Sequence, residues 1–347
     1  QLFSWIREQV VKRNISQIKL FWILGLITFV LSAFLDNLTT TLIMIQIGRN
    51  IYKDNDNFLI FVANTVIAAN AGGVASPIGD VTTIMLWLAN KFNAIEVILI
   101  GIVPAIVAWV VPQYFLTNKI KPAVNSHSTI TPNINSEVEV VPCWSIICVA
   151  LFSFLLPVIF NFVGLPPFLG LLLGLGILWI CMDIKARNGH PDHTAGRIVH
   201  IIQKTDISTL KFFIGILLAV SALSHIGLLA SLNDFIFGSS VDMTRLIVGN
   251  TILGLASSIL DNVPLVAAAI QMFAQDVPVS VWVLLALTAG TGGSLLVIGS
   301  AAGVAAMGQV KGLHFNYYLK NATLPALLGY VCSILVWVGM YSMGLFG

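Results

Sequence analysis

Long apolar stretches, separated by short polar segments, follow one another along almost the whole chain. Seven of them reach about the 20 residues that a helix needs to cross a bilayer. They predict helices at residues 58–90, 94–117, 143–163, 166–182, 207–231, 279–308 and 320–345. Two further stretches, 20–48 and 246–274, each carry an Asp-Asn pair near the middle. The pattern predicts an all-α membrane protein that crosses the bilayer many times.

The two stretches with Asp-Asn pairs are too long for one straight span. As a single helix each would measure about 43 Å, against a hydrocarbon core of about 30 Å. Each is either a tilted spanning helix or a hairpin that re-enters the membrane with the Asp-Asn pair at its tip. The positions of the Lys and Arg residues favour hairpins. Fifteen of the seventeen then share one face, opposite Lys91 and Arg245, as expected for a cytoplasmic face.

A two-fold repeat underlies this pattern. Residues 32–37 (SAFLDN) match residues 257–262 (SSILDN) 225 positions later. The Gly-rich residues 70–80 (NAGGVASPIGD) and 290–300 (GTGGSLLVIGS) also match, and a Gly-Gly pair in a membrane segment predicts a broken helix. The first hairpin would open from the cytoplasmic face and the second from the other face. We therefore predict inverted repeats with two re-entrant hairpins and two discontinuous helices.

These elements predict the domain organisation. Residues 1–117 form the first repeat, with hairpin 20–48, broken helix 58–90 and helix 94–117. Residues 118–142 are a polar cytoplasmic linker, and residues 143–347 form the second repeat, with hairpin 246–274 and broken helix 279–308. Only 35 residues precede Asp36, whereas 118 separate Cys143 from Asp261. The first repeat is therefore expected to lack N-terminal spans in this chain.

Composition supports the membrane class. Hydrophobic residues make up 57% of the chain and charged residues 9%, whereas about a quarter of the residues in a soluble protein are charged. The net charge of +2 gives no reason to expect a nucleic-acid partner; the partner is the lipid bilayer. The four cysteines lack metal or redox spacing and are expected to be packing residues. His190 and His193, in a basic loop at 183–206, are interpreted as loop residues and not as a metal site.

Polar side chains gather at the hairpin tips and at the Gly-rich breaks. Exposed helix ends at membrane depth are tolerated only where they line a cavity or bind a ligand. Hydroxyl, amide and carboxylate oxygens are the donors that small hard cations prefer. The candidate ion-binding and proton-binding residues are Asp36, Asn37, Thr39, Thr40, Asn70, Asp80, Thr82, Thr83, Ser257, Asp261, Asn262, Ser294 and Ser300.

Three of these candidates are carboxylates, and no Lys or Arg accompanies them in the motifs. Asp36, Asp80 and Asp261 are therefore candidate ligands of a metal ion, Na+ or Li+, and not of an anionic substrate. Burial and neighbouring like charges favour the protonated form of an acid, so a proton and a metal ion would compete for one site. The simpler alternative is a helix cap. The repeat disfavours it for Asp36 and Asp261, whereas for Asp80, matched by Ser300, both roles stay open.

At these residues the chain resembles the NhaD-type sodium/proton antiporters of the ion transporter superfamily. The resemblance covers essentially the whole chain and rests on residues 32–41 (SAFLDNLTTT), 70–87 (NAGGVASPIGDVTTIMLW), 257–264 and 290–303 (GTGGSLLVIGSAAG). It implies inverted repeats, re-entrant hairpins, unwound helices at the Gly-rich breaks, exchange of Na+ or Li+ for H+, and a homodimer. We further expect a multi-pass protein of the bacterial inner membrane with no cofactor beyond the transported ions.

Three other functions would use parts of the same pattern. The same scaffold could carry an anion such as arsenite or a carboxylate. An intramembrane aspartyl protease needs two membrane-embedded Asp residues, and residues 77–80 (PIGD) loosely resemble the Gly-x-Gly-Asp of that group, but this leaves the repeated Asp-Asn unexplained. A channel fits inverted, broken helices less well than alternating access does.

Overall fold

A computed structural model describes residues 16–52, 54–121, 144–153, 155–165, 167–187, 207–237, 242–273 and 277–346 of the chain. All secondary structure in these ranges is helical, which confirms the all-α class. Most of the predicted linker 118–142, together with His190 and His193, lies outside the described residues. The contacts within the chain divide it into two compact units.

The smaller unit contains helices from the middle of the sequence. Helices α7 (Trp144–Ser153) and α8 (Leu156–Phe162) pack against α9 (Pro167–Arg187), and α11 (Ile207–His225) begins in this unit. The helix predicted at 143–163 is interrupted just before Pro157, since proline opposes continuation of a helix through the residue before it. The predicted span 207–231 is also interrupted. It bends by 83° between α11 and α12 (Leu228–Ile236), at Gly227 with its positive φ of 76°.

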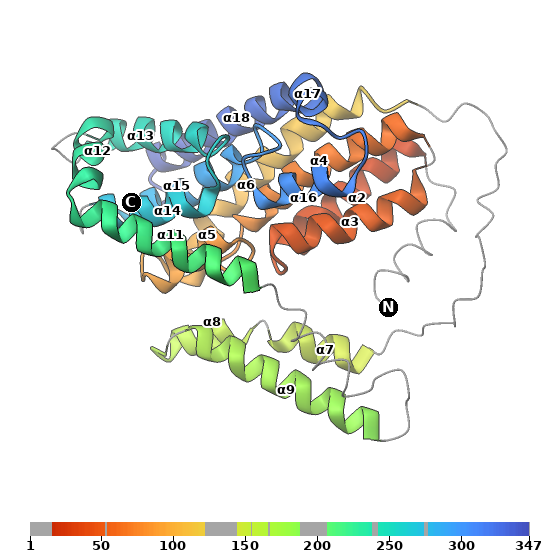
Figure 1. Ribbon diagram of the computed structural model, residues 1–347, viewed down its shortest axis with the longest axis horizontal. Coiled ribbons are helices and arrows are strands. Elements are labelled where there is room, and N and C mark those ends of the chain that lie inside the picture. Colours follow the sequence, from red (N-terminus) through yellow and green to blue (C-terminus); the bar gives the residue numbers. More distant parts are fainter. Residues whose placement is uncertain are drawn as a thin grey trace. The chain divides into compact units, whose positions relative to one another are not determined.

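The larger unit contains two halves with the same order of helices (Figure 1). The first half runs through α2 (Gln17–Ser32), α3 (Asn37–Ile51), α4 (Asn55–Gly73), α5 (Val81–Leu88) and α6 (Ala94–Thr117). The second half runs through α13 (Met243–Ala256), α14 (Asn262–Met272), α15 (Val279–Gly292), α16 (Ala301–Gln309), α17 (Phe315–Tyr318), the π-helix η2 (Leu319–Thr323) and α18 (Leu324–Ser342). We call α2–α3 the first helix pair and α13–α14 the second.

Non-helical residues interrupt each half at matching places. The first helix pair is interrupted at residues 33–36 and the second at 257–261, at the Asp-Asn motifs. Residues 74–80 separate α4 from α5, and residues 293–300 separate α15 from α16. We call these two segments the first break and the second break. The first break follows its Gly-Gly pair, and the second begins at the second glycine of its pair.

Glycine allows the first helix of each pair to lie against the long helix beside it. A Cβ atom on Gly72 would collide with the carbonyl oxygen of Phe29, and one on Gly292 with that of Gly254. Serine hydroxyls add a hydrogen bond at the same level, from Ser32 to the Ala69 carbonyl at 2.6 Å. In the second half Ser257 donates to the Ala289 carbonyl at 2.7 Å. The ends of α2 and α13 are thereby fixed beside the breaks.

The second helix of each pair returns along the same long helix. Gly48, near the end of α3, lies against Phe58 and Phe61 near the start of α4. In the second half, the ring of Phe273 at the end of α14 lies 4.9 Å from that of Trp282 near the start of α15. Both helices of each pair therefore pack against one long helix, and the turn between them lies next to the break.

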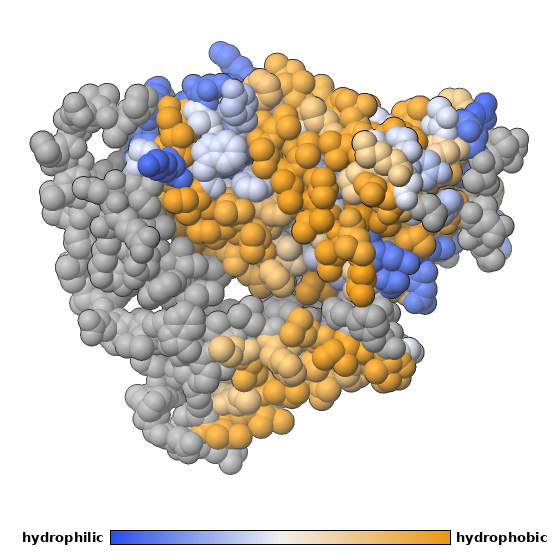
Figure 2. All heavy atoms as spheres, turned by 180° about the vertical axis from the view of Figure 1, so that it is seen from behind, coloured by the Kyte–Doolittle hydropathy of each residue, from blue (hydrophilic) through white to orange (hydrophobic). Residues whose placement is uncertain are grey.

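Two of the described helical segments are long and apolar enough to cross a membrane, namely Ala94–Thr117 and Phe315–Ser342. The bent pair formed by α11 and α12 makes a third if it counts as one span. Many large apolar side chains on these helices are exposed, including Leu99 at 66% and Leu335 at 62%. Figure 2 shows an apolar surface across the middle of one face of the larger unit, with hydrophilic residues toward its ends. Such a surface is expected of a protein whose sides face lipid.

Charged side chains lie at one end of the larger unit and bond to one another and to the backbone. Lys121, just after α6, forms an ion pair with Asp56 at 2.5 Å, near the start of α4. The hydrogen bond and the charge of Asp56 raise the pKa of the Lys121 ammonium group. Arg49, at the end of α3, donates to the Gln309 carbonyl at the end of α16. This end therefore joins the starts and ends of helices from both halves.

Candidate functional site

Asp80 is a buried carboxylate that contacts both halves of the larger unit. Its side chain is 1% exposed and caps α5, with Oδ1 accepting from the Thr82 N–H at 3.4 Å. The Thr83 hydroxyl accepts from the Asp80 N–H at 3.3 Å and completes a capping box. The second oxygen, Oδ2, accepts from the amide of Asn262 in the other half at 3.1 Å. One carboxylate thus combines helix capping with a contact between the halves.

Asn70 lies at the centre of a second buried polar group. Its Nδ2 donates to the hydroxyls of Ser294 at 2.8 Å and Ser300 at 2.9 Å, which belong to the second break. Its Oδ1 accepts from Asn37 Nδ2 at 3.0 Å, at the start of α3. All four side chains are at most 5% exposed. The structure therefore brings together four residues that the sequence separates by up to 263 positions.

The two halves differ at the position of this asparagine. Gly290 stands 220 residues after Asn70, so the second half has no amide there. A Cβ on Gly290 would lie 3.5 Å from Asp80 Oδ2 and would collide with a methyl group of Val74. Asn37 bonds to Asn70 in its own half. Because the second half has no amide at the matching position, Asn262, the counterpart of Asn37, bonds to Asp80 of the first half instead.

The two Asp-Asn acids are also in different environments. Asp36 caps α3 and accepts from the Thr39 N–H at 2.8 Å and the Thr39 hydroxyl at 2.5 Å. Asp261 forms no side-chain capping bond, and its Oδ1 is buried without a hydrogen-bond partner. Asp36 thus has both oxygens occupied, whereas Asp261 has an unpaired one.

Other oxygens near the first tip are also buried without a partner. They are the hydroxyls of Thr40 and Thr41 in α3. A buried polar atom without a hydrogen bond is uncommon in proteins and calls for an explanation such as a bound ion. Thr41 was not among the sequence candidates, although it ends the Thr39–Thr41 run. Of the candidates, Ser257 is engaged in packing, since its hydroxyl donates to the Ala289 carbonyl.

The described residues contain no group of three His, Cys, Asp or Glu side chains placed to share one metal ion. In the same part of the chain, no ion pair involves Asp36, Asp80 or Asp261. The site therefore consists of single carboxylates surrounded by neutral amides and hydroxyls. Such a mixed set of hard oxygens suits a small cation of low charge.

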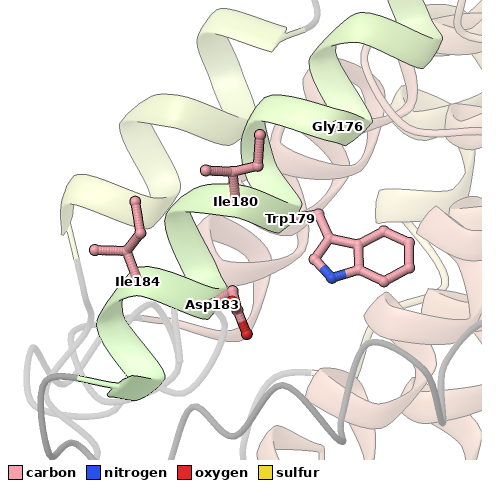
Figure 3. A pocket seen from close by; sticks show the side chains of 5 residues that line it. All are labelled: Gly176, Trp179, Ile180, Asp183 and Ile184. Atoms are coloured by element: carbon pink, nitrogen blue, oxygen red, sulfur yellow. The ribbon is translucent and has the colours of Figure 1, made fainter.

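A hollow on the smaller unit is separate from these groups. It is lined by Gly176, Trp179, Ile180, Asp183 and Ile184, all on α9 (Figure 3). Because every lining residue comes from one helix, side chains do not converge on it from several directions. It lacks the arrangement expected of a binding site for a small ligand.

Comparison with known proteins identifies the family. A model of the citrate transporter family matches residues 1–290. Sodium/proton antiporter 1 of Arabidopsis thaliana is 35% identical over 99% of the chain and 59% of its own length. Sodium/proton antiporter 2 of the same plant is 34% identical over 94% of the chain and 78% of its own length. The Na+/H+ antiporter NhaD of Halomonas elongata is 32% identical over 97% of the chain and 70% of its own length. The chain belongs to the NhaD-type antiporter family.

Membership in the NhaD-type family decides two of the sequence interpretations. The family consists of membrane transporters, so the chain is a multi-pass membrane protein and not an enzyme. The alternative of an intramembrane protease is therefore wrong. The chain spans about three fifths of the first plant relative and about seven tenths of the Halomonas NhaD protein.

Proposed function

We propose that the protein exchanges Na+ or Li+ for H+ across a membrane by alternating access. The observation that carries this proposal is the Asp80 carboxylate, buried between the two halves and bonded to Asn262 with no basic side chain beside it among the described residues. A buried carboxylate without a positively charged neighbour is costly unless it binds a proton or a cation. The names of the NhaD and plant relatives, which are sodium/proton antiporters, agree with this choice.

Competition between the two ions follows from the chemistry of a carboxylate. Protonation of Asp80 removes the negative charge that attracts a metal ion, and a bound metal ion disfavours protonation. Asp36, Asp80 and Asp261 are our candidate metal ligands, each acting with neutral oxygens of the other sequence candidates and not as one cluster of three acids. The unpaired oxygens of Asp261 and Thr40 support this assignment. A carboxylate substrate is disfavoured, because three acids would repel it.

We also propose that the halves are inverted repeats and that the helix pairs are re-entrant hairpins. The return of α3 and α14 to the starts of α4 and α15 supports the hairpins. The start of α4 lies near Asp56 and Lys121, after α6. The start of α15 lies at the other end of the broken helices, where Lys91, just after α5, is 4.6 Å from the Trp282 ring. Helices α4 and α15 therefore enter from opposite ends.

The resemblance adds two further proposals, a homodimer and a bacterial inner membrane. Cross-linking of the protein in membranes tests the dimer, and fractionation of the host cell tests the membrane. A monomer that resists cross-linking at every surface position would contradict the dimer.

Exchange is tested in proteoliposomes that contain a pH-sensitive dye. We expect Na+ or Li+ to release protons from acid-loaded vesicles. Asp36→Asn and Asp261→Asn should each abolish this exchange, because a neutral amide cannot alternate between a proton and a cation. Full exchange by both variants would refute the proposed ion site. Proton movement driven by citrate or arsenite, and not by Na+ or Li+, would favour the anion carrier.

A further inference from the structure

Two hydroxyl groups outside the predicted site hold the second break in place. Tyr318 donates its hydroxyl to the Ser294 carbonyl at 2.7 Å, and Thr323 donates to the Leu295 carbonyl at 2.7 Å. Both carbonyls lie just after the end of α15, where helical hydrogen bonds are no longer available. Tyr318 is completely buried.

The π-helix η2 explains how both hydroxyls reach adjacent carbonyls. Tyr318 and Thr323 are five residues apart; Tyr318 directly precedes η2 and Thr323 is its last residue. In an α-helix, at 3.6 residues per turn, their side chains would point about 140° apart. A π-helix instead pairs residue i with residue i+5, which brings the two side chains toward one face. One turn of π-helix is therefore sufficient to direct both at the second break.

The first break has no such support among the described residues. Val74 and Ala75 stand 220 residues before Ser294 and Leu295, and no described side chain donates to either carbonyl. Instead, helix α6 passes close to the first break, where a Cβ atom on Gly101 would lie 3.4 Å from the Val74 carbonyl oxygen. The hydroxyl pair is thus specific to the second half.

Ser294 connects this support to the candidate site. Its carbonyl accepts from Tyr318, and its hydroxyl accepts from Asn70 at 2.8 Å. Because both bonds are to one residue, a shift of the Ser294 backbone also moves the hydroxyl away from Asn70. We propose that Tyr318 and Thr323 are positioning residues, which fix the second break so that Ser294 stays in the ion site. This inference rests on the proposed function and names two residues that support its site.

The test compares variants that differ by single hydroxyl groups. Tyr318→Phe and Thr323→Val remove the hydroxyls at nearly constant volume, and Thr323→Ser retains one. Tyr330→Phe is the matched control, since Tyr330 donates to the Thr251 carbonyl of α13 at 2.7 Å and not to a carbonyl of either break. The measurements are Na+ affinity of the purified protein by calorimetry, and the Na+ dependence of exchange in proteoliposomes.

We expect Tyr318→Phe and Thr323→Val to weaken Na+ binding about three- to tenfold, the usual effect of one lost hydrogen bond. Half-saturating Na+ should rise equally, with turnover at saturation within about twofold. Thr323→Ser and Tyr330→Phe should match the parent. A purely structural role would instead lower the yield and thermal stability without changing the affinity of the folded protein.

A double variant shows whether Tyr318 acts through Ser294. In a Ser294→Ala background, Tyr318→Phe should have no further effect on Na+ affinity, because the hydroxyl that it positions is gone. An equal effect in both backgrounds, or no effect in the parent, would overturn the inference. If the parent binds Na+ and loses affinity on Tyr318→Phe but exchanges no protons, the proposed function fails and the positioning role stands. A parent that neither binds nor exchanges Na+ would refute both.

Discussion

At the scale of single residues, Asp80 combines the two roles between which the sequence does not decide. One carboxylate oxygen accepts from the Thr82 N–H and caps α5, and the other accepts from Asn262. Helix capping alone would be served equally well by asparagine, a comparable N-cap residue. The two roles can therefore be separated by a substitution that keeps the cap and removes the charge.

We predict that Asp80→Asn abolishes Na+-dependent proton movement while changing the free energy of unfolding by less than about 1 kcal/mol. The reason is that the amide still caps α5 but cannot exchange a proton for a cation. Asp54→Asn is the matched control, because Asp54 caps α4 in the same way at the charged end of the unit. Vesicle exchange and thermal unfolding measure the two effects. Exchange at the parental rate by Asp80→Asn would limit Asp80 to a structural role.

Residue types and their repetition were sufficient to predict most of the candidate site. Asn37, Asn70, Ser294 and Ser300 are polar residues in apolar stretches, and the structure places Asn70 within hydrogen-bonding distance of the other three. The role of Tyr318 could not be predicted. A tyrosine near the start of an apolar helix is ordinary, and its bond to Ser294 depends on how η2 packs against the second break.

At the scale of elements, the interruptions of the helices follow local signals. Polar pairs and Gly-Gly pairs mark the turns of both helix pairs and both breaks, and these positions are visible in the sequence. The bend after His225 was not expected, because apolar residues continue on both sides of Gly227. The π-helix η2 contains no Pro or Gly. Pro325 follows it, however, and has no N–H to bond the Asn321 carbonyl of η2, which is a local signal for an irregular turn at this point.

The close approach of helices at glycine gives a prediction about stability. Gly72→Ala and Gly292→Ala should each destabilise the protein by about 1–3 kcal/mol or more, because the new methyl group meets a backbone carbonyl that cannot rotate away. Gly308→Ala, in α16 with open space around it, should be neutral or stabilising by up to about 1 kcal/mol. Thermal unfolding in detergent compares them. Equal melting temperatures for all three variants would show that the helices can separate without cost.

At the scale of the whole larger unit, side-chain hydrogen bonds join the two halves at the breaks. Asn262 bonds to Asp80, and Asn70 bonds to Ser294 and Ser300. Each contact pairs a residue of one half with a residue of the other. The repeat predicts two matching sets of polar residues, one in each half. Only the fold shows that the hydrogen bonds connect a residue of one set with a residue of the other.

The proposed inverted arrangement predicts which positions face the same side of a membrane. Single cysteines at Asp56 and Lys311, in a protein whose four native cysteines are replaced, should react with an impermeant maleimide from one side. Cysteines at Asn90 and Arg245 should react from the other side. Labelling of intact and inverted vesicles gives the comparison. Reaction of all four positions from one side would contradict inverted repeats.

The two copies also differ in length, which shows where the chain accepts insertions and deletions. The Asp-Asn motifs are 225 residues apart, but the Gly-Gly pairs are 220 apart, so the second copy is five residues shorter between its tip and its break. Both helices between the tip and the break are shorter in the second copy, with 15 residues in α3 and 11 in α14, and 19 residues in α4 and 14 in α15. The serine bond from each tip to its long helix is nevertheless present in both copies. A reporter peptide intended to leave the ion site intact therefore belongs at the far end of a returning helix.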